Sequence, residues 1–526
     1  MIRVRQIFID IDKDKKEELL DKVSYKLNIS KTDILNIKIN KKSIDARKKT
    51  KIHYVYEVDI EVLNENKVLK RNSSKDVFLT PDETFVFNVT GTRNMENRPV
   101  IVGSGPAGLF SAYFLSKYGY KPLIIERGES IENRVITVEE FWKTGKLCPN
   151  SNVQFGEGGA GTFSDGKLNT LVKDKKYLMK KVFEIFVECG APEEIMYINN
   201  PHIGTDLLRK VVVNMRNKII GYGGEFRYNT TLTDLIIKSG KLEGIVLNNK
   251  EKLYCDNLIL AIGHSARDTF KMLYKNNLKM ASKPFAVGVR VIHPQKMINK
   301  NQYGEFDLGS ASYKLTYNNL DRGVYSFCMC PGGFVVNSSS EDGKLVVNGM
   351  SNYKRDSGYA NSAIVVTVSK DDYGDDVFDG VSFQEKLEEK AHIIGRGNIP
   401  VQFFNDYNNN KISYLKNENI NKMIKGNYTF SDLNETFPDY INKSLKEAFS
   451  QFDEKIAGFS SNNPLLLGVE SRTSSPVKFY RDVNLMSNIK GIYPCGEGSG
   501  YAGGITTSAI DGIKVAEVIA RTYNNK

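Results

Sequence analysis

Apolar and polar residues alternate with a period of two in two segments near the start of the chain, residues 2–9 and 52–62. This pattern predicts β-strands. Between them, over residues 19–27, apolar side chains recur at the spacing of a helix face. We therefore predict a small α+β domain over residues 1–97, and nothing in its sequence indicates catalysis.

The pattern changes at Pro99. A short, wholly apolar run is followed by a G-x-G-x-x-G turn, a helix face and a second apolar run that ends at an acid. In order these are residues 100–102, then Gly103, Gly105 and Gly108, then residues 109–115 and 123–125, and Glu126. This order of strand, glycine turn, helix, strand and acid is typical of a dinucleotide-binding fold.

Each part of this motif has a physical role. The first glycine permits the tight turn, the second lets the backbone approach a pyrophosphate, and the third lets the helix pack on the strand. The free N–H groups at the helix N-terminus favour an anion. Glu126 lies 18 positions after Gly108, near the place expected for a carboxylate that binds ribose hydroxyls.

A second strand–glycine–helix junction lies near the end of the chain. Residues 492–495 lead into Gly496-Glu497-Gly498, and a helix face follows from Ile505. An acid-glycine turn before a helix N-terminus suits a flavin, because the helix dipole stabilises negative charge on the reduced ring. A third predicted strand, residues 258–262, ends at Gly263.

Four segments together resemble a known family: residues 156–168, 261–268, 470–476 and 496–504. They are similar to flavoproteins of the glutathione-reductase fold that carry one dinucleotide site, and more closely to the bacterial family of uncharacterised FAD-dependent dehydrogenases. The resemblance covers nearly the whole chain. It implies an α/β fold: a Rossmann-type FAD-binding domain, an inserted α+β substrate domain and the small N-terminal α+β domain. The expected ranges are 1–97 for the N-terminal domain, 98–275 and 462–526 for the two parts of the FAD-binding domain, and 276–461 for the insert.

The resemblance also implies FAD as the cofactor and places its contacts. The first turn would bind the pyrophosphate, Glu126 the ribose, Leu232 the adenine, and the C-terminal turn the flavin, where Glu497 replaces the more common Asp. The cofactor-binding residues expected in this way are Gly103, Gly105, Pro106, Ala107, Gly108, Glu126, Arg127, Gly159, Gly161, Leu232, Gly263, Gly496, Glu497, Gly503, Gly504 and Ile505.

Two features of nicotinamide-linked disulfide reductases are missing from the sequence: a second G-x-G-x-x-G before a helix, and a C-x-x-C pair. Cys328 and Cys330 lie in a predicted strand, where residues two apart share a face roughly 6.5–7 Å apart. That separation is at or beyond the reach of an undistorted disulfide. We interpret them, and Cys495, as small core residues. The five histidines have no ligand spacing, so we expect no metal site.

Polar clusters interrupt the predicted strands of the insert, and they supply our catalytic candidates. We predict that Arg290, His293 and Arg355 face the flavin and bind an anionic or carbonyl-bearing substrate, because Arg can hold a carboxylate in two bonds and His can exchange a proton near neutral pH. The alternative is that they are ordinary solvated or strand-pairing residues. The next candidates are His264, Arg472 and Tyr501, which adjoin the flavin motifs in sequence.

Composition narrows the setting. The 526 residues have a net charge of +11, and the densest basic stretch, residues 38–51, is interpreted as a solvated Lys-rich face. No apolar run approaches the ~18 residues of a membrane helix, and six cysteines without a paired framework indicate a reduced, cytoplasmic setting without membrane contact.

These observations predict an FAD-dependent oxidoreductase that transfers hydride between a small organic substrate and flavin N5, with an unassigned electron donor or acceptor. Two alternatives stay open: a flavoprotein that modifies RNA or a lipid-like alkene, and a flavin-binding regulatory or RNA-contacting protein with little turnover. The mild, dispersed charge does not favour a nucleic-acid partner.

Overall fold

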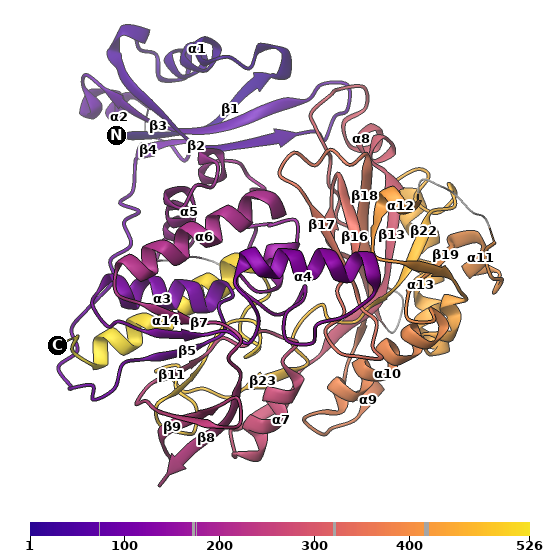
Figure 1. The fold of residues 1–526 in the computed structure, drawn as a ribbon. Helices are drawn as coiled ribbons and strands as arrows, with labels where there is room; N and C mark the ends of the chain where they lie inside the picture. The colour runs from indigo at the N-terminus through magenta and orange to yellow at the C-terminus, as the bar shows by residue number, and fades with distance from the viewer. Residues whose placement is uncertain (73, 171–173, 175, 319–321, 415–419, 526) are drawn as a thin grey trace.

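The computed structural model describes residues 1–72, 74–170, 174, 176–318, 322–414 and 420–525. Figure 1 shows three parts: a small N-terminal unit at the top, a parallel sheet flanked by helices at the lower left, and a large sheet with its own helices at the right.

The N-terminal unit is a four-stranded antiparallel sheet in the order β2-β3-β1-β4. The apolar residues of the alternating segments and of α1 form one small core, which confirms the predicted strands and helix. The elements are β1 (Ile2–Asp10), α1 (Lys16–Leu27), β2 (Ile34–Asp45), β3 (His53–Val62), α2 (Glu65–Asn72) and β4 (Val77–Leu79).

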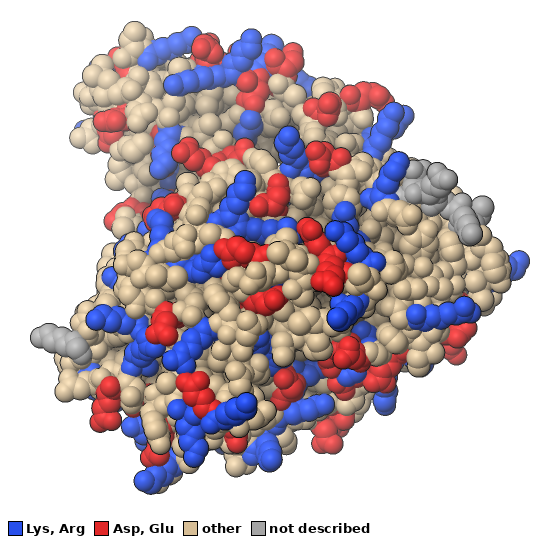
Figure 2. Space-filling model, viewed as in Figure 1, with Lys and Arg blue, Asp and Glu red and all other residues tan. Residues whose placement is uncertain are grey.

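The basic stretch of residues 38–51 begins on β2, and part of it contacts the rest of the chain. The Lys42 N–H donates to the Tyr197 carbonyl at 2.7 Å, and the Lys42 carbonyl accepts from the Asn199 N–H at 2.9 Å. The Lys42 ammonium is paired with Asp14 at 2.6 Å. This part of the stretch is therefore an intramolecular contact rather than a solvated face. Elsewhere Lys and Arg are interspersed with Asp and Glu over the surface in view (Figure 2).

The second part is built on a five-stranded sheet in the order β24-β11-β5-β6-β7, in which each neighbouring pair is parallel. Its strands are short, and all but the edge strand β7 are buried, as expected for a parallel sheet covered on both faces. They are β5 (Val100–Val102), β6 (Leu123–Ile125), β7 (Glu225–Arg227), β11 (Leu258–Leu260) and β24 (Ile492–Pro494).

Different elements pack on the two faces of this sheet. Ile101 and Ile124 pack against the helices α3 (Pro106–Lys117), α5 (Leu178–Glu188), α6 (Thr205–Gly221) and α14 (Ile505–Thr522). Alternate residues of the same strands pack against an antiparallel layer and α7. That layer comprises β8 (Leu232–Lys238), β9 (Lys241–Leu247) and β10 (Glu251–Tyr254), and α7 spans Arg267–Lys275.

The third part is a seven-stranded sheet in the order β14-β15-β18-β13-β22-β19-β21. All its neighbouring pairs are antiparallel except β19 with β21. The strands are β13 (Phe285–Pro294), β14 (Thr316–Asn318), β15 (Gly323–Cys330), β18 (Tyr359–Val368), β19 (Ile399–Phe403), β21 (Tyr428–Phe430) and β22 (Leu465–Glu470).

The membership of β22 corrects one expected boundary. Residues 462–526 were expected to return to the FAD-binding part, but β22 is hydrogen-bonded between β13 and β19. The sheet of the insert therefore continues to Glu470. Its place between β13 and β19 is filled by β22, which is distant from β13 in sequence.

One face of the seven-stranded sheet packs on α13 (Asp439–Lys455) and α10 (Asp379–Ile394) in the largest core of the molecule. The opposite face, with Ala286, Ala363 and Phe327, belongs to a separate, smaller cluster on the side toward the parallel sheet. The remaining elements are α4 (Ile131–Thr144), α8 (Gln295–Tyr303), α9 (Lys370–Tyr373), α11 (Phe404–Asn408), α12 (Ile420–Met423), β12 (Met280–Ser282), β16 (Gly333–Asn337), β17 (Val347–Ser351), β20 (Ile424–Lys425) and β23 (Val477–Phe479). Within the described ranges, no helix is both long enough and apolar enough to cross a membrane.

Candidate functional site

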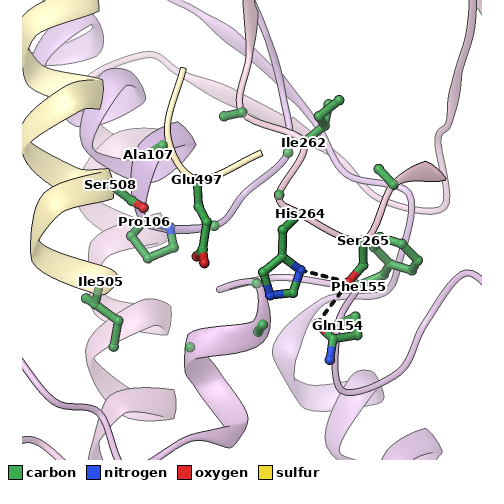
Figure 3. A pocket seen from close by; sticks show the side chains of 18 of the residues that line it. Pro106, Ala107, Gln154, Phe155, Ile262, His264, Ser265, Glu497, Ile505 and Ser508 are labelled. Carbon is green, nitrogen blue, oxygen red and sulfur yellow. Dashed lines mark hydrogen bonds between the residues drawn. The ribbon is translucent and has the colours of Figure 1, made fainter. Parts of the chain in front are cut away.

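A cavity of about 370 Å³ lies between the two large sheets. Residues that directly follow β5, β6 and β11 line it, so it opens at the carboxyl ends of the parallel strands, where open α/β sheets bind their ligands. Figure 3 shows Glu497 and His264 projecting into it from different segments of the chain. All the predicted cofactor-binding residues except Gly108 and Gly496 line this cavity.

The backbone of the first glycine turn fits the three roles that its spacing predicts. A Cβ on Gly103 would lie 2.3 Å from the Ala261 carbonyl oxygen, and one on Gly108 would lie 1.9 Å from that of Gly103. Gly108 is thus required for packing, behind the cavity wall. At Gly105 the nearest atom to such a Cβ is Gly159 Cα at 3.8 Å. The backbone at Gly105 therefore leaves room for a ligand.

Two helices begin at the cavity wall. Gly105 precedes α3 and Gly504 precedes α14, and neither N-terminus has a side-chain cap. Their first N–H groups carry partial positive charge and favour an anion. The paired arrangement suits the diphosphate of a dinucleotide at α3 and an electron-rich ring at α14.

The space beside these turns fits a large planar cofactor. Gly263, Gly503 and Gly504 all line the cavity, and a Cβ on any of them would meet no protein atom within 4 Å. The room is therefore not filled by the chain itself. Gly161 lies between this space and Ile505, whose side chain is 3.2 Å from a Cβ position on Gly161. These glycines make a smooth wall against which a flavin ring can lie.

The Glu126 carboxylate, expected from its sequence position to bind a ribose, is already hydrogen-bonded to the protein through both of its oxygens. One carboxylate oxygen accepts from the Ser104 N–H at 3.0 Å and hydroxyl at 2.7 Å, and the other accepts from the N–H groups of Gly128 and Gly156, both at 3.0 Å. The buried carboxylate thus joins three loops of the cavity wall. A ribose would have to share these acceptor positions. Arg127 lines the same end of the cavity and is paired with Asp268 at 2.8 Å.

Glu497 projects into the cavity, and no described residue donates a hydrogen bond to its carboxylate. Burial raises the pKa of Glu497 to about 7, although Lys283 opposes the shift. Ribityl hydroxyls of a flavin would supply the missing donors, and they would stabilise the ionised form.

The raised pKa of Glu497 predicts a pH effect on FAD-stripped protein. A carboxyl whose pKa is higher in the folded than in the unfolded state costs stability once it must ionise. Below its unfolded pKa, near 4.5, the cost is absent, and it develops as pH rises toward about 7. In thermal melts of FAD-stripped protein, the midpoint of Glu497→Gln relative to that of the wild type should therefore rise between pH 5 and pH 8. A difference between the two melting midpoints that stays constant across that range would contradict the raised pKa of Glu497.

The loop of residues 152–159, which forms another wall, is held by Arg134 on α4. Its guanidinium is fully buried and donates to the carbonyls of Asn152, Val153, Gly156, Glu157 and Gly159, at 2.6–3.2 Å. The hydrogen bonds to Gly156 and Gly159 fix the glycine wall directly. Nothing in the helical pattern of α4 distinguishes this arginine from a surface residue.

The three predicted catalytic residues are not brought together. Arg290 and His293 lie three positions apart on β13, so they point to opposite faces of the sheet. His293 is buried in the large core, where its Nε2 is 2.7 Å from the Phe459 carbonyl oxygen. Burial lowers its pKa to about 4. The prediction that His293 faces the flavin is therefore wrong in location, and the strand period explains why.

Arg290 and Arg355 lie behind the cavity wall and hold residues that form it. Arg290 donates to Glu470 at 2.8 Å and to Asn348 at 2.9 Å, and both partners line the cavity. Arg355 donates to Asp165 at 2.5 Å. Neither arginine is itself a lining residue, so in the structure both contact residues of the wall rather than the cavity.

Two of the three next candidates do line the cavity. His264 accepts or donates at Nδ1 with the Ser265 hydroxyl at 2.8 Å, and burial, together with Arg472 and Arg267, lowers its pKa to about 3. Arg472 lines the cavity but is paired with Glu388. Tyr501 does not line it, and its hydroxyl donates to the Phe479 carbonyl at 2.9 Å.

The sequence-based prediction missed Lys167, Cys328 and Asn348, which line the end of the cavity formed by the insert. The Lys167 ammonium nitrogen is buried without a hydrogen-bond partner among the described residues, and the nearest carboxylate oxygen, on Asp165, is 3.6 Å away. Lys167 lies inside the glycine-rich segment 156–168, so proximity to that motif was the available signal.

Comparisons with known proteins give three family matches. Residues 284–473 match a family described as "FAD-dependent protein, C-terminal domain-like". Residues 101–144 match an NAD(P)-binding Rossmann-like domain, and residues 1–61 match a domain of unknown function.

Whole-chain similarity is strong for one relative. A protein of Clostridium beijerinckii, described as an uncharacterized protein, is 47% identical over 533 residues, with 99% of each chain covered. Thiamine thiazole synthase of Methanococcus aeolicus is 26% identical over 194 residues, which are 35% of this chain and 61% of that one. Among solved structures, glycine oxidase from Bacillus cereus gives a TM-score of 0.35 at 12% identity, with 82% of this chain and 96% of that one covered.

Proposed function

Because this chain belongs to the family of FAD-dependent proteins represented by its Clostridium relative, we propose that it transfers hydride between a small organic substrate and flavin N5. FAD is its cofactor, and the chain is related to FAD-dependent oxidoreductases. FAD supplies the atom that accepts or donates the hydride. The protein supplies binding, orientation and charge.

The observation that carries this proposal is the extension of the cavity beyond the glycine walls into the insert. There the insert contributes Asn348 to the wall, and Lys167 and His264 line the same cavity. A cofactor alone does not need a cation and an amide at this position, whereas a substrate with a carboxylate or carbonyl oxygen does.

Lys167 is the group best placed to bind the substrate anion. A buried ammonium without a hydrogen bond is costly, and its cost is removed when an anion enters. The other cations near the cavity are occupied, since Arg472 is paired with Glu388 at 2.8 Å and Arg290 with Glu470 at 2.8 Å. Lys167 has Asp165 at 3.6 Å but no hydrogen-bond partner among the described residues, so it is the cation at this end whose donors are free for a substrate.

His264 is the proposed proton carrier. Its lowered pKa keeps the imidazole neutral at neutral pH, so one ring nitrogen can donate and the other can accept. The Ser265 hydroxyl, which itself donates to Gln154 at 3.3 Å, orients the ring. A neutral imidazole beside the reacting carbon can take or give the proton that accompanies hydride transfer.

Substituting Lys167 tests the proposal. Anaerobic addition of small 2-hydroxy, 2-amino and unsaturated carboxylic acids to the holoprotein, oxidised or pre-reduced, should change the yellow flavin absorbance with at least one acid. In Lys167→Met the concentration needed for half the effect should rise by about tenfold or more, because a charge-assisted hydrogen bond contributes about 1.5–3 kcal/mol.

The control is Lys275→Met, which removes an exposed lysine at the end of α7. It should behave as the wild type. An unchanged half-effect concentration in Lys167→Met would remove Lys167 from the substrate site. Failure of every acid in both directions would overturn the proposed hydride transfer.

A further inference from the structure

Two cysteines at the end of β15 meet in a way that a regular strand does not allow. Pairing of β15 with β18 is interrupted between Phe327 and Cys330, and Cys328 has φ +46°. A non-glycine residue in this region is uncommon and often marks a functional site. The bulge removes the separation that residues two apart have in an extended strand.

The Cys330 thiol consequently turns back toward Cys328 and donates to the carbonyl oxygen of that residue at 3.2 Å. Both are free thiols in the structure. Our interpretation of Cys328 and Cys330 as unrelated core residues is corrected for Cys328, which is half-buried and lines the cavity.

Cys328 lines the same cavity as Glu497, the acid of the C-terminal turn, and its charge adds to the raised pKa of that carboxyl. Cys330 is fully buried. Cys328 therefore lines the cofactor space, whereas the Cys330 thiol is protected from solvent and hydrogen-bonded to the Cys328 carbonyl.

The surroundings favour a thiolate on Cys328. Its pKa is lowered because the Cys330 side chain, Lys167 and Arg290 lie nearby, whereas burial and Asp165 oppose the shift. The pKa of Cys330 is raised, so this thiol retains its proton. Low-pKa, partly accessible thiols in such electropositive surroundings are the reactive ones.

We propose that Cys328 and Cys330 form a redox-active dithiol that exchanges two electrons with FAD. In the oxidative direction the Cys328 thiolate and Cys330 thiol form one S–S bond and release one proton and two electrons, which FAD takes up. The reverse step cleaves that bond and returns them. This proposal rests on the proposed function, and it supplies the second two-electron carrier of a chain with a single dinucleotide turn.

Anaerobic reductive titration of the oxidised holoprotein tests the dithiol. Dithionite should be consumed to about four electron equivalents per FAD in the wild type, since the flavin and the disulfide each take two. Cys328→Ser and Cys330→Ser should consume about two. Cys148→Ser, which removes a half-buried cysteine outside the cavity, should still consume about four.

Peptide mass gives a readout that is independent of turnover. After mild oxidation with diamide and alkylation under denaturing conditions, the peptide that contains both residues should be unalkylated and lighter by two hydrogens. FAD content of each variant verifies folding, and Cys330→Ala replaces Cys330→Ser if the buried hydroxyl prevents it.

Consumption of only two equivalents by the wild type, or alkylation of both cysteines after oxidation, would overturn the dithiol. The proposed hydride transfer fails differently, through lack of any flavin change with the acid panel. If the wild-type flavin responds to an acid but the protein consumes only two electron equivalents, the proposed hydride transfer stands and the proposed dithiol is refuted.

Discussion

Gly105→Val should fold and lose FAD, so the purified protein should be colourless. The backbone at Gly105 has φ −71°, which valine adopts without strain, and no protein atom lies within 3.8 Å of the Cβ position. The new methyl groups would instead occupy the space where the backbone meets the pyrophosphate. We expect FAD affinity to fall by at least about 100-fold, or about 2.7 kcal/mol.

The measurement is FAD per chain after gel filtration, with an equilibrium titration of the stripped protein. Gly221→Val is the matched control, because Gly221 is exposed at the end of α6 and has open space around it. It should retain FAD. A Gly105→Val protein with full flavin content would refute the cofactor assignment at this turn, whereas an unfolded one would indicate a packing role like that of Gly108.

The cofactor side of the site could be predicted from the sequence because its determinants are local. A turn that needs φ of +98° at Gly103 and close packing at Gly108 restricts both positions to glycine within a few residues of a strand and a helix. The order of apolar runs around them then identifies the fold. Such signals survive in a single sequence.

The substrate side could not be predicted in this way, because its determinants are distant in sequence. Cys328 reaches the cavity through a bulge, and no residue pattern predicts that bulge. Lys167 is distinguished only by a buried ammonium that has no hydrogen-bond partner among the described residues, which no sequence shows. The error at His293 was avoidable, however: Arg290 and His293 are an odd number of residues apart on one strand, so they could not share a face.

The interface between the insert and the FAD-binding part depends on a charge network that has no sequence signal. Glu388 on α10 is fully buried between two guanidinium groups. Its oxygens accept from Arg267 at 2.7 and 2.8 Å and from Arg472 at 2.8 and 3.0 Å. The Ser471 hydroxyl donates a further bond at 2.6 Å. α10, α7 and the segment after β22 are thus joined at one carboxylate.

Glu388→Ala should therefore be strongly destabilising. It leaves Arg267 and Arg472 buried, with only the partly exposed Glu341 as a shared partner at 2.9 and 3.1 Å. Removal of one member of a buried ion pair costs about 3–5 kcal/mol. The urea midpoint and the thermal midpoint should both fall, and FAD should be released at a lower temperature than in the wild type, because Arg472 lines the cavity.

The charge of Glu388, rather than its volume, should account for this loss. Glu388→Gln preserves the shape and should still lose most of the stabilisation, whereas Glu389→Ala, at the exposed next position of α10, should change stability by less than about 0.5 kcal/mol.

The two arginines lower the pKa of Glu388 against the opposing effect of burial. The contribution of the Glu388 carboxylate to the free energy of unfolding is thus complete above its unfolded pKa, near 4.5. It disappears as pH falls through the pKa of Glu388 in the folded state. Equal midpoints for Glu388→Gln and the wild type at pH 7 would show that packing, not charge, joins the two parts.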